Sequence, residues 1–143
     1  MQHINVKVKL LHPEAKMPFY GSEEAAGFDL YTLEEKTINS GETLVVSTGV
    51  ALEIEKGYCW QFWDRSGMGA KGIACLGGLG DSDYRGEFKV ILHNTTKKSY
   101  KIEKGDRIIQ VVPVPIVKAS FEQVDDLSPS KRGEGGFHST GKK

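Results

Sequence analysis

The sequence predicts an all-β domain with the form of a jelly-roll-like β-barrel, followed by a flexible glycine-rich C-terminal arm. Two patterns predict the barrel. Apolar and polar residues alternate along many short runs, which is typical of half-buried antiparallel strands. Turns rich in glycine separate these runs, and no long amphipathic helical stretch accompanies them. The length of 143 residues, with 17 glycines and 5 prolines, fits one compact domain with many turns.

The expected elements follow the chain in order. Residues 4–10 form the first predicted strand, because Ile4, Val6 and Val8 alternate with polar neighbours. A short helix is expected to begin near Ser66. The other predicted strands are Thr43–Ser47, Val50–Glu55, Cys59–Trp63, Glu87–Leu92 and Arg107–Pro113.

Composition disfavours several classes of function. Lysine and arginine total 19 against 19 for aspartate and glutamate, so the net charge indicates neither a nucleic-acid nor a membrane-surface partner. No apolar run approaches the ~18 residues of a bilayer-spanning helix, and the start of the chain lacks a signal-peptide pattern. A cytoplasmic location is therefore expected. Cys59 and Cys75 have apolar neighbours, which favours two buried thiols over a disulfide or a nucleophile.

The segment 128–143 differs in character from the rest, and we place a boundary between a domain of residues 1–127 and this arm. The arm is rich in glycine, Phe137 is its one large apolar residue, and its basic residues outnumber Glu134. Such a segment cannot bury enough apolar surface to order by itself. Two interpretations stay open: a solvated tail, or an arm that becomes ordered over an anionic ligand.

Five polar or glycine-rich segments interrupt the predicted strands, and each has an ordinary structural interpretation when taken singly. Arg65–Gly67 would suit a helix N-terminus as well as a phosphate site. Asp81–Asp83 would suit a solvated turn. The five segments are Ala26–Tyr31, Asp64–Ile73, Gly77–Glu87, Gly105–Gln110 and Arg132–Gly141.

Taken together, in this order and spacing, the five segments resemble the five motifs of the homotrimeric dUTPase family. The most specific matches are Asp81–Gly86, with the pattern Asp-x-Asp-Tyr-Arg-Gly, and Arg132–Phe137, with the pattern Arg-Gly-x-Gly-Gly-Phe. The resemblance runs from Ala26 to Gly141. It implies a β jelly roll that hydrolyses dUTP to dUMP and pyrophosphate, which limits uracil incorporation into DNA and supplies dUMP for dTMP synthesis.

The resemblance assigns the chemistry to the third motif. Asp81 would act as the general base for a water that attacks the α-phosphorus, although the sequence does not separate it from Asp83. Backbone groups of Gly78 and Leu79 would match the donors and acceptors of uracil and leave those of cytosine unpaired. Tyr84 would pack against the deoxyribose and disfavour a 2′-hydroxyl. Its alternative interpretation is a core residue beside a hairpin.

Three further motifs are assigned to the triphosphate and its metal. The resemblance implies that Arg65, Ser66, Gly67 and Gln110 donate to phosphate oxygens. It places Asp29 near Mg²⁺, the implied cofactor, with a water between the carboxylate and the metal.

The fifth motif supplies the arm. Phe137 would stack on uracil, and Arg132 would reach the γ-phosphate in the manner of an arginine finger. Ser139 and Thr140 would add hydroxyl donors, and His138, in place of the usual glycine, would add a contact or a pH dependence. The resemblance also implies a homotrimer in which all three subunits build each active site.

Besides His138, the chain departs from the family pattern in three further motifs. Ile109 replaces the usual alanine before Gln110, and Gly67–Gly69 replaces a more usual serine-leucine-alanine stretch. Gly80 replaces a bulky aliphatic residue before Asp81, which is expected to loosen the geometry of the base. None of these changes removes a catalytic side chain.

Other functions fit less well. A dCTP deaminase, a relative with the same fold, would need a glutamate near the third motif and would lack the arm. A role in binding a regulatory protein partner, with nucleotide controlling the complex, stays open beside the enzymatic activity. The chain has no basic groove with interleaved aromatic residues, which disfavours direct binding of nucleic acid.

Overall fold

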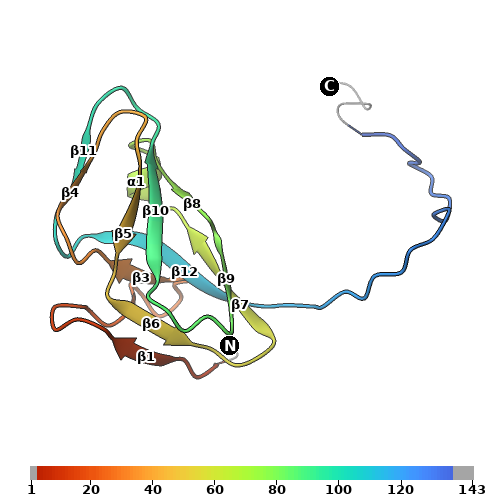
Figure 1. Cartoon of the computed structure of the whole chain (residues 1–143), viewed down its shortest axis with the longest axis horizontal. Coiled ribbons are helices and arrows are strands. Elements are labelled where there is room, and N and C mark those ends of the chain that lie inside the picture. The colour runs from red at the N-terminus through yellow and green to blue at the C-terminus, as the bar shows by residue number, and fades with distance from the viewer. Residues whose placement is uncertain (1–2, 137–143) are drawn as a thin grey trace.

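The computed structural model describes residues 3–136, and within them the chain forms a β-sheet body with one short helix (Figure 1). The all-β prediction is confirmed. The strands are β1 (Lys7–Leu10), β2 (Phe19–Tyr20), β3 (Phe28–Tyr31), β4 (Lys36–Ile38), β5 (Thr43–Ser47), β6 (Val50–Glu53), β7 (Tyr58–Trp63), β8 (Ile73–Leu76), β9 (Leu79–Asp81), β10 (Lys89–Asn94), β11 (Tyr100–Ile102) and β12 (Arg107–Pro115). The helix is α1 (Ser66–Gly69).

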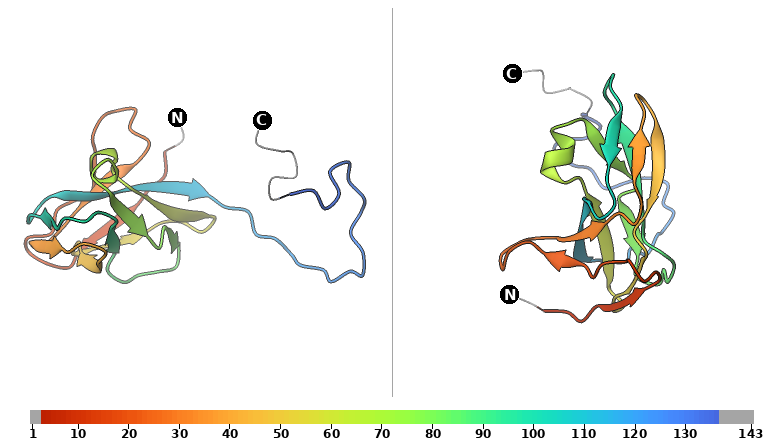
Figure 2. Two further views of the ribbon diagram at one scale, coloured as in Figure 1. Left: turned by 90° about the horizontal axis from the view of Figure 1, so that it is seen from above. Right: turned by 90° about the vertical axis from the view of Figure 1, so that its left-hand side faces the viewer.

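Antiparallel pairing arranges the strands in two larger and two smaller sheets, seen from two further sides in Figure 2. The largest has the order β2-β3-β12-β7-β9, and a second has the order β5-β10-β8. The pairs β1-β6 and β11-β4 complete the body. Strand β9 lies at an edge of the largest sheet, so it pairs with β7 on one side and leaves its other side open.

Side chains from both larger sheets fill the core. Trp60 in β7 is fully buried, and Phe28 in β3 and Phe88 beside β10 pack edge-on against its ring. In β10, Val90 and Leu92 are buried while the residues between them are more exposed, as the two-residue period of a strand requires. The apolar alternation in the sequence therefore encodes a core that lies between the sheets.

The predicted elements agree with the structure over most of their length. The predicted strand Thr43–Ser47 matches β5, and the short helix begins at Ser66 as expected. The first strand begins later than predicted, at Lys7. The expectation that all five motifs interrupt the strands is wrong for Phe28–Tyr31 and Leu79–Asp81, which form β3 and β9. Their backbone groups find partners on β12 and β7, and this tertiary pairing is absent from the local pattern.

The two cysteines differ in burial. Cys59 is buried, as predicted, whereas Cys75 in β8 is only half-buried, and both thiols are free. Burial, with a smaller contribution from the nearby Asp64 carboxylate, raises the pKa of the Cys75 thiol to about 11. The thiol is therefore protonated and unreactive near neutral pH.

Strand β12 leads out of the body. It pairs with β3 only as far as Val111, whereas its pairing with β7 continues to Pro115. Pro113 and Pro115 lack a backbone N–H. They lie in the part of β12 that has only β7 as a neighbouring strand, where fewer backbone donors are needed. Ile116 N still donates to Gly57 O at 2.9 Å, and beyond it the chain leaves the body (Figures 1 and 2).

The segment beyond β12 exposes its apolar residues. Val117 is 97% exposed, Phe121 95% and Leu127 87%. Several large apolar side chains on one short segment are rarely left in water, and these three have no apolar partner among residues 3–136 of the single chain. Within residues 3–136, no helix is both long and apolar enough to cross a membrane.

Candidate active site

A surface hollow of about 290 Å³ lies beside the third motif. Its walls are formed by strand β9, by the turn that follows β9 and by the start of β10. Phe62 of β7 also lines it. We call it the nucleoside hollow. Its lining includes Phe62, Leu79, Asp81, Tyr84, Glu87 and Phe88.

The register of β9 determines which backbone groups face the open edge. Phe62 N donates to Gly78 O at 2.9 Å, and Gln61 pairs with Leu79 in register. In an antiparallel pair, hydrogen-bonded and non-hydrogen-bonded residues alternate. The backbone groups of Gly78 and Gly80 are therefore directed at β7, whereas those of Leu79 point away from it. Leu79 thus presents one donor and one acceptor at the edge of the sheet.

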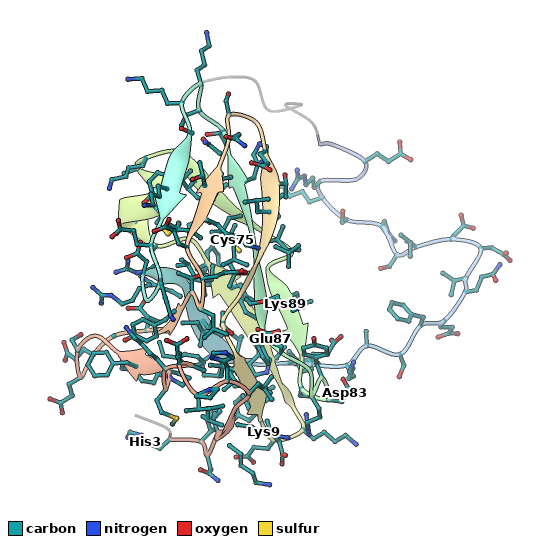
Figure 3. The ribbon with its side chains drawn as sticks, turned by 60° about the vertical axis from the view of Figure 1, so that its left-hand side comes forward. His3, Lys9, Cys75, Asp83, Glu87 and Lys89 are labelled. Atoms are coloured by element: carbon teal, nitrogen blue, oxygen red, sulfur yellow. The ribbon has the colours of Figure 1, made fainter. Side chains whose placement is uncertain are left out.

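Asp81 and Asp83 have different positions. Asp81 ends β9 and lines the nucleoside hollow, while Asp83 lies further along the exposed turn and is not among the lining residues. Figure 3 shows Asp83 in this turn, set apart from Glu87 and Lys89 near the start of β10. Of the two acids that the sequence could not separate, only Asp81 faces the hollow.

Tyr84 forms one wall of the hollow and is held from three directions. Its hydroxyl donates to Glu87 O at 3.0 Å, and its ring lies edge-on to Phe88 with centroids 5.8 Å apart. A Cβ at Gly86 would lie 2.6 Å from Tyr84 Cζ, so any larger residue at this position would displace the ring. Tyr84 is 48% exposed, which excludes the interpretation as a buried core residue.

The second motif begins at the N-terminus of α1. Arg65 precedes the helix in an extended conformation, and its side chain turns back to Asp29 in β3. Arg65 Nε lies 3.2 Å from Asp29 Oδ1, and Arg65 Nη1 donates to Arg107 O at 3.2 Å. Ser66 and Gly67 are exposed at the surface.

Asp29 holds a second arginine. Arg107 Nη1 lies 3.1 Å from Asp29 Oδ2, so each carboxylate oxygen accepts from a different guanidinium. The Asp29 side chain is only 8% exposed, and the two ion pairs stabilise its charge inside the protein. One negative and two positive charges leave this cluster with a net positive charge.

The cluster borders a second hollow of about 480 Å³, which we call the basic hollow. Arg65, Gly67, Lys71 and Arg107 are among its lining residues, and none of the residues that line it also lines the nucleoside hollow. Gln110 lines neither of them. It lies in β12 opposite Asp29 of β3 and Trp63 of β7. The residues predicted for the base and for the phosphates are therefore not brought together in a single chain.

The arm motif lies partly outside the described residues. Arg132 is exposed and donates from Nε to Gly135 O at 2.6 Å within its own turn. It lines neither hollow. Phe137, His138, Ser139 and Thr140 lie outside the described residues.

The side chains do not form a metal cage. In residues 3–136, no group of three or more histidine, cysteine, aspartate or glutamate side chains is placed to hold a metal ion. Asp29 already accepts from two arginines, so it does not present a free carboxylate for direct coordination. A magnesium ion that arrives on the phosphate oxygens of a nucleotide, with waters completing its shell, remains compatible with this arrangement.

Two departures from the family pattern have a structural explanation. A Cβ at Gly80 would lie 3.1 Å from the ring of Phe62 and 3.2 Å from Trp60 Cβ, so the two aromatic residues occupy the space of a larger side chain. This packing restrains β9 beside Asp81, which argues against the expected loosening. Ile109 is fully buried in the core and does not alter the surface near Gln110.

Comparison with known proteins identifies the family. The family model described as dUTPase matches residues 13–141. The chain belongs to the dUTPase family. The deoxyuridine 5′-triphosphate nucleotidohydrolase of Nautilia profundicola is 47% identical over 142 residues, covering 97% of this chain and 100% of that protein. The enzyme of the same name from Paramecium bursaria Chlorella virus 1 is 44% identical over 135 residues, covering 94% and 96%.

A solved dUTPase has the same fold. The Staphylococcus bacteriophage 80alpha dUTPase with dUPNHPP superimposes with a TM-score of 0.90 at 31% identity, covering 96% of this chain and 98% of that one. Its structure is described in connection with phage dUTPases that control transfer of virulence genes. Membership of the family confirms the resemblance carried by the five motifs.

Several residues that build the dUTPase hollows were given no role from the sequence. Phe62, Glu87 and Phe88 line the nucleoside hollow, and Arg107 shares Asp29 with Arg65. Arg107 lies inside the fourth motif, so a charge count over the motifs would have singled it out. The aromatic residues belong to strand patterns that predict only core positions.

Proposed function

We propose that this dUTPase-family protein hydrolyses dUTP to dUMP and pyrophosphate with Asp81 as the general base. The observation that carries the proposal is the position of Asp81 on the lining of the nucleoside hollow, at the open edge of β9. A carboxylate there can orient a water and accept its proton as the water attacks the α-phosphorus. The leaving group is pyrophosphate, and the nucleoside monophosphate stays in the hollow.

Base recognition is assigned to the edge of β9. Uracil presents two carbonyl acceptors on either side of an N–H donor, and the outward backbone groups of Leu79 supply one donor and one acceptor. Cytosine exchanges a donor and an acceptor at this edge, so it would leave polar groups unpaired. Gly78, which precedes Leu79, has no side chain and so leaves room for a base to approach the backbone.

Sugar recognition is assigned to Tyr84. Its ring is backed by Phe88 and Gly86 and presents its open side to the hollow. A deoxyribose can pack against an aromatic ring, whereas a ribose would bring a hydroxyl that the ring cannot pair. UTP is therefore expected to be a poor substrate.

The triphosphate is assigned to the basic groups. Arg65, Ser66 and Gly67 at the start of α1 supply positive charge and backbone donors, and Gln110 adds an amide. Arg132 of the arm would reach the γ-phosphate. For the remainder of the arm, Phe137 is proposed to stack on uracil, with His138, Ser139 and Thr140 as further polar contacts.

A homotrimer with shared active sites accounts for the separation of the two hollows. In one chain, Asp81 and Arg65 line different hollows, and Arg132 lines neither. The exposed apolar residues of 117–127 provide a segment that a neighbouring subunit can cover. We therefore assign the base, the phosphate groups and the arm of one site to different subunits.

Magnesium is proposed as the cofactor. The dUTPase of phage phi11 of S. aureus, 26% identical to this chain, has a solved structure described as coordinating a structural Mg(II) ion. Bound to the triphosphate, the metal would neutralise charge that develops on the phosphate oxygens. Asp29 would act on it only through a water, since both of its oxygens accept from arginines. A cytoplasmic location and a regulatory protein partner remain predictions.

The test measures pyrophosphate release from dUTP, dCTP, dTTP and UTP in the presence of Mg²⁺. Wild-type protein should release it selectively from dUTP. Asp81→Asn should lower the rate by roughly 10²–10⁴-fold, and truncation before Arg132 should also lower it strongly. Asp83→Asn is the matched control, because this acid lies outside the hollow, and it should retain activity within about twofold.

Each outcome has a distinct consequence. No release from dUTP by the wild-type protein would refute the enzymatic function. Equal losses in Asp81→Asn and Asp83→Asn would refute the assignment of the base. Release from all four nucleotides would leave a pyrophosphatase activity but remove the account of base and sugar recognition.

A further inference from the structure

A series of aromatic rings runs through the core to the nucleoside hollow. Tyr20 contacts Phe28 with ring centroids 5.6 Å apart, and Phe28 contacts Trp60 at 6.0 Å. Trp60 contacts Phe88 at 5.8 Å, and Phe88 contacts Tyr84 at the same distance. All four contacts are edge-on, the arrangement that the charge distribution of aromatic rings favours. Through Phe88, the buried Trp60 of the core is therefore in continuous ring contact with Tyr84 in the wall of the hollow.

Phe88 is the fixed point of this series. Its backbone N donates to Val50 O at 2.8 Å, and its backbone O accepts from Thr48 Oγ1 at 2.6 Å. Its side chain is 3% exposed and also stacks on Phe62, with centroids 5.6 Å apart and ring planes 30° apart. A ring held by this many neighbours has little room to change rotamer.

Tyr84, by contrast, is half exposed and is the last ring of the series. Its place depends on the hydroxyl bond to Glu87 O, on the bare backbone of Gly86 and on the edge of Phe88. Of these three contacts, only Phe88 contributes a side chain. Its ring lies between Tyr84 and the core and so prevents the tyrosine ring from moving inward. Removal of the Phe88 ring would open that direction.

We propose that Phe88 is a positioning residue for Tyr84 and thereby sets the discrimination between dUTP and UTP. This proposal rests on the proposed function, since it concerns selectivity in the same hollow. With Phe88 in place, the Tyr84 ring stands where a 2′-hydroxyl would lie. Without it, the ring can retreat into the vacated space and a ribose can enter. A shift of about 1 Å in a group that contacts the substrate is enough to change rates by orders of magnitude.

The experiment compares Phe88→Leu with Phe28→Leu. Both changes remove a buried ring that contacts Trp60, but Phe28 belongs to β3 and does not line the hollow. The quantities measured are kcat/KM for dUTP and for UTP, together with the dissociation constants of dUMP and UMP by calorimetry. Phe88→Leu should lower the dUTP/UTP ratio of kcat/KM by about tenfold and narrow the dUMP/UMP affinity ratio similarly. Phe28→Leu should leave both ratios within about twofold of wild type.

A second variant does not depend on the core remaining intact. Gly86→Ala adds a methyl group 2.6 Å from Tyr84 Cζ and must displace the ring, so it should lower the same ratios. It decides the question if Phe88→Leu does not fold: wild-type ratios in Gly86→Ala would then overturn the proposal, because the position of Tyr84 would not set selectivity.

Other results separate this inference from the proposed function. A folded Phe88→Leu with the wild-type dUTP/UTP ratio would overturn the positioning role while leaving dUTP hydrolysis intact. An equal loss of selectivity in Phe28→Leu would also overturn it, because the cause would be general loosening of the core. A wild-type protein without activity on dUTP would refute the proposed function itself.

Discussion

Asp29→Asn would remove the negative charge that Arg65 and Arg107 share. The variant keeps the shape of the side chain, but one of its terminal atoms becomes an N–H donor facing a guanidinium that also donates. The contact with Arg65 is the more sheltered, since the arginine side chain is 25% exposed, and it should account for about 1.5–3 kcal/mol. The Arg107 side chain is 45% exposed, so its pair should add only about 0–1 kcal/mol.

The expected loss of unfolding free energy is therefore about 1.5–4 kcal/mol, which corresponds to a fall in Tm of about 5–15 °C. Thermal melts should be recorded in EDTA, without nucleotide and at matched protein concentrations, because formation of the proposed homotrimer would make Tm depend on concentration. Asp83→Asn, a change of the same kind in an exposed turn, serves as the control and should melt within about 1 °C of wild type.

The design separates a structural role of Asp29 from a role at the metal. If Asp29 acts mainly by holding the two arginines, the loss in Tm appears without Mg²⁺, and the Mg²⁺ concentration for half-maximal activity stays near that of wild type. A variant with unchanged Tm in EDTA but a Mg²⁺ requirement raised by about tenfold or more would refute this reasoning. It would show that the carboxylate acts at the metal.

Two further predictions concern the packing beside Asp81 and the thiol of Cys75. Gly80→Ile should destabilise the protein by about 1–3 kcal/mol, because Phe62 and Trp60 already occupy the space, and Phe62→Ala in the same chain, which removes the ring that lies 3.1 Å from a Cβ at position 80, should relieve part of that loss. Urea unfolding of both single variants and the double variant measures the coupling, and simple additivity would contradict the account. Burial raises the Cys75 pKa from 9.0 to about 11, so at pH 8 alkylation by iodoacetamide should be about 10²-fold slower in folded than in unfolded protein. Peptide mapping reports the rate, and rapid labelling of native Cys75 would count against this environment.

Local patterns predicted β5 and β10, in which exposure differs between neighbouring residues, but they did not predict the three-residue strands β4 and β11. Residues of β5 and β10 alternate between core and surface, and alternation is visible in any window of the sequence. Strand β3 is only four residues long, and its charged residue Asp29 is buried because two arginines pair with it, which the local pattern does not show. Strand β9 was missed because its glycine-rich sequence is typical of a turn, and only pairing with β7 makes it a strand.

The sequence predicted individual residues of the candidate site but not the contacts between them. The motifs located Asp81, Tyr84 and Arg65, and the structure places the first two on one hollow and the third on another. The motifs gave no sign that Phe88 supports Tyr84. Such a contact depends on how two side chains pack, and an apolar residue in a strand indicates burial without indicating its neighbour.

The fold class followed from alternation and turns, and the family followed from five motifs in order. That Asp29 holds Arg65, 36 residues away, and Arg107, 78 residues away, became visible in three dimensions alone. The structure likewise separated Asp81 from Asp83. The physical reason is that the interaction of charges depends on distance and burial in space. Distance and burial cannot be read from the spacing of residues along the chain. The period of a strand and the residue preferences of a turn can be read from it.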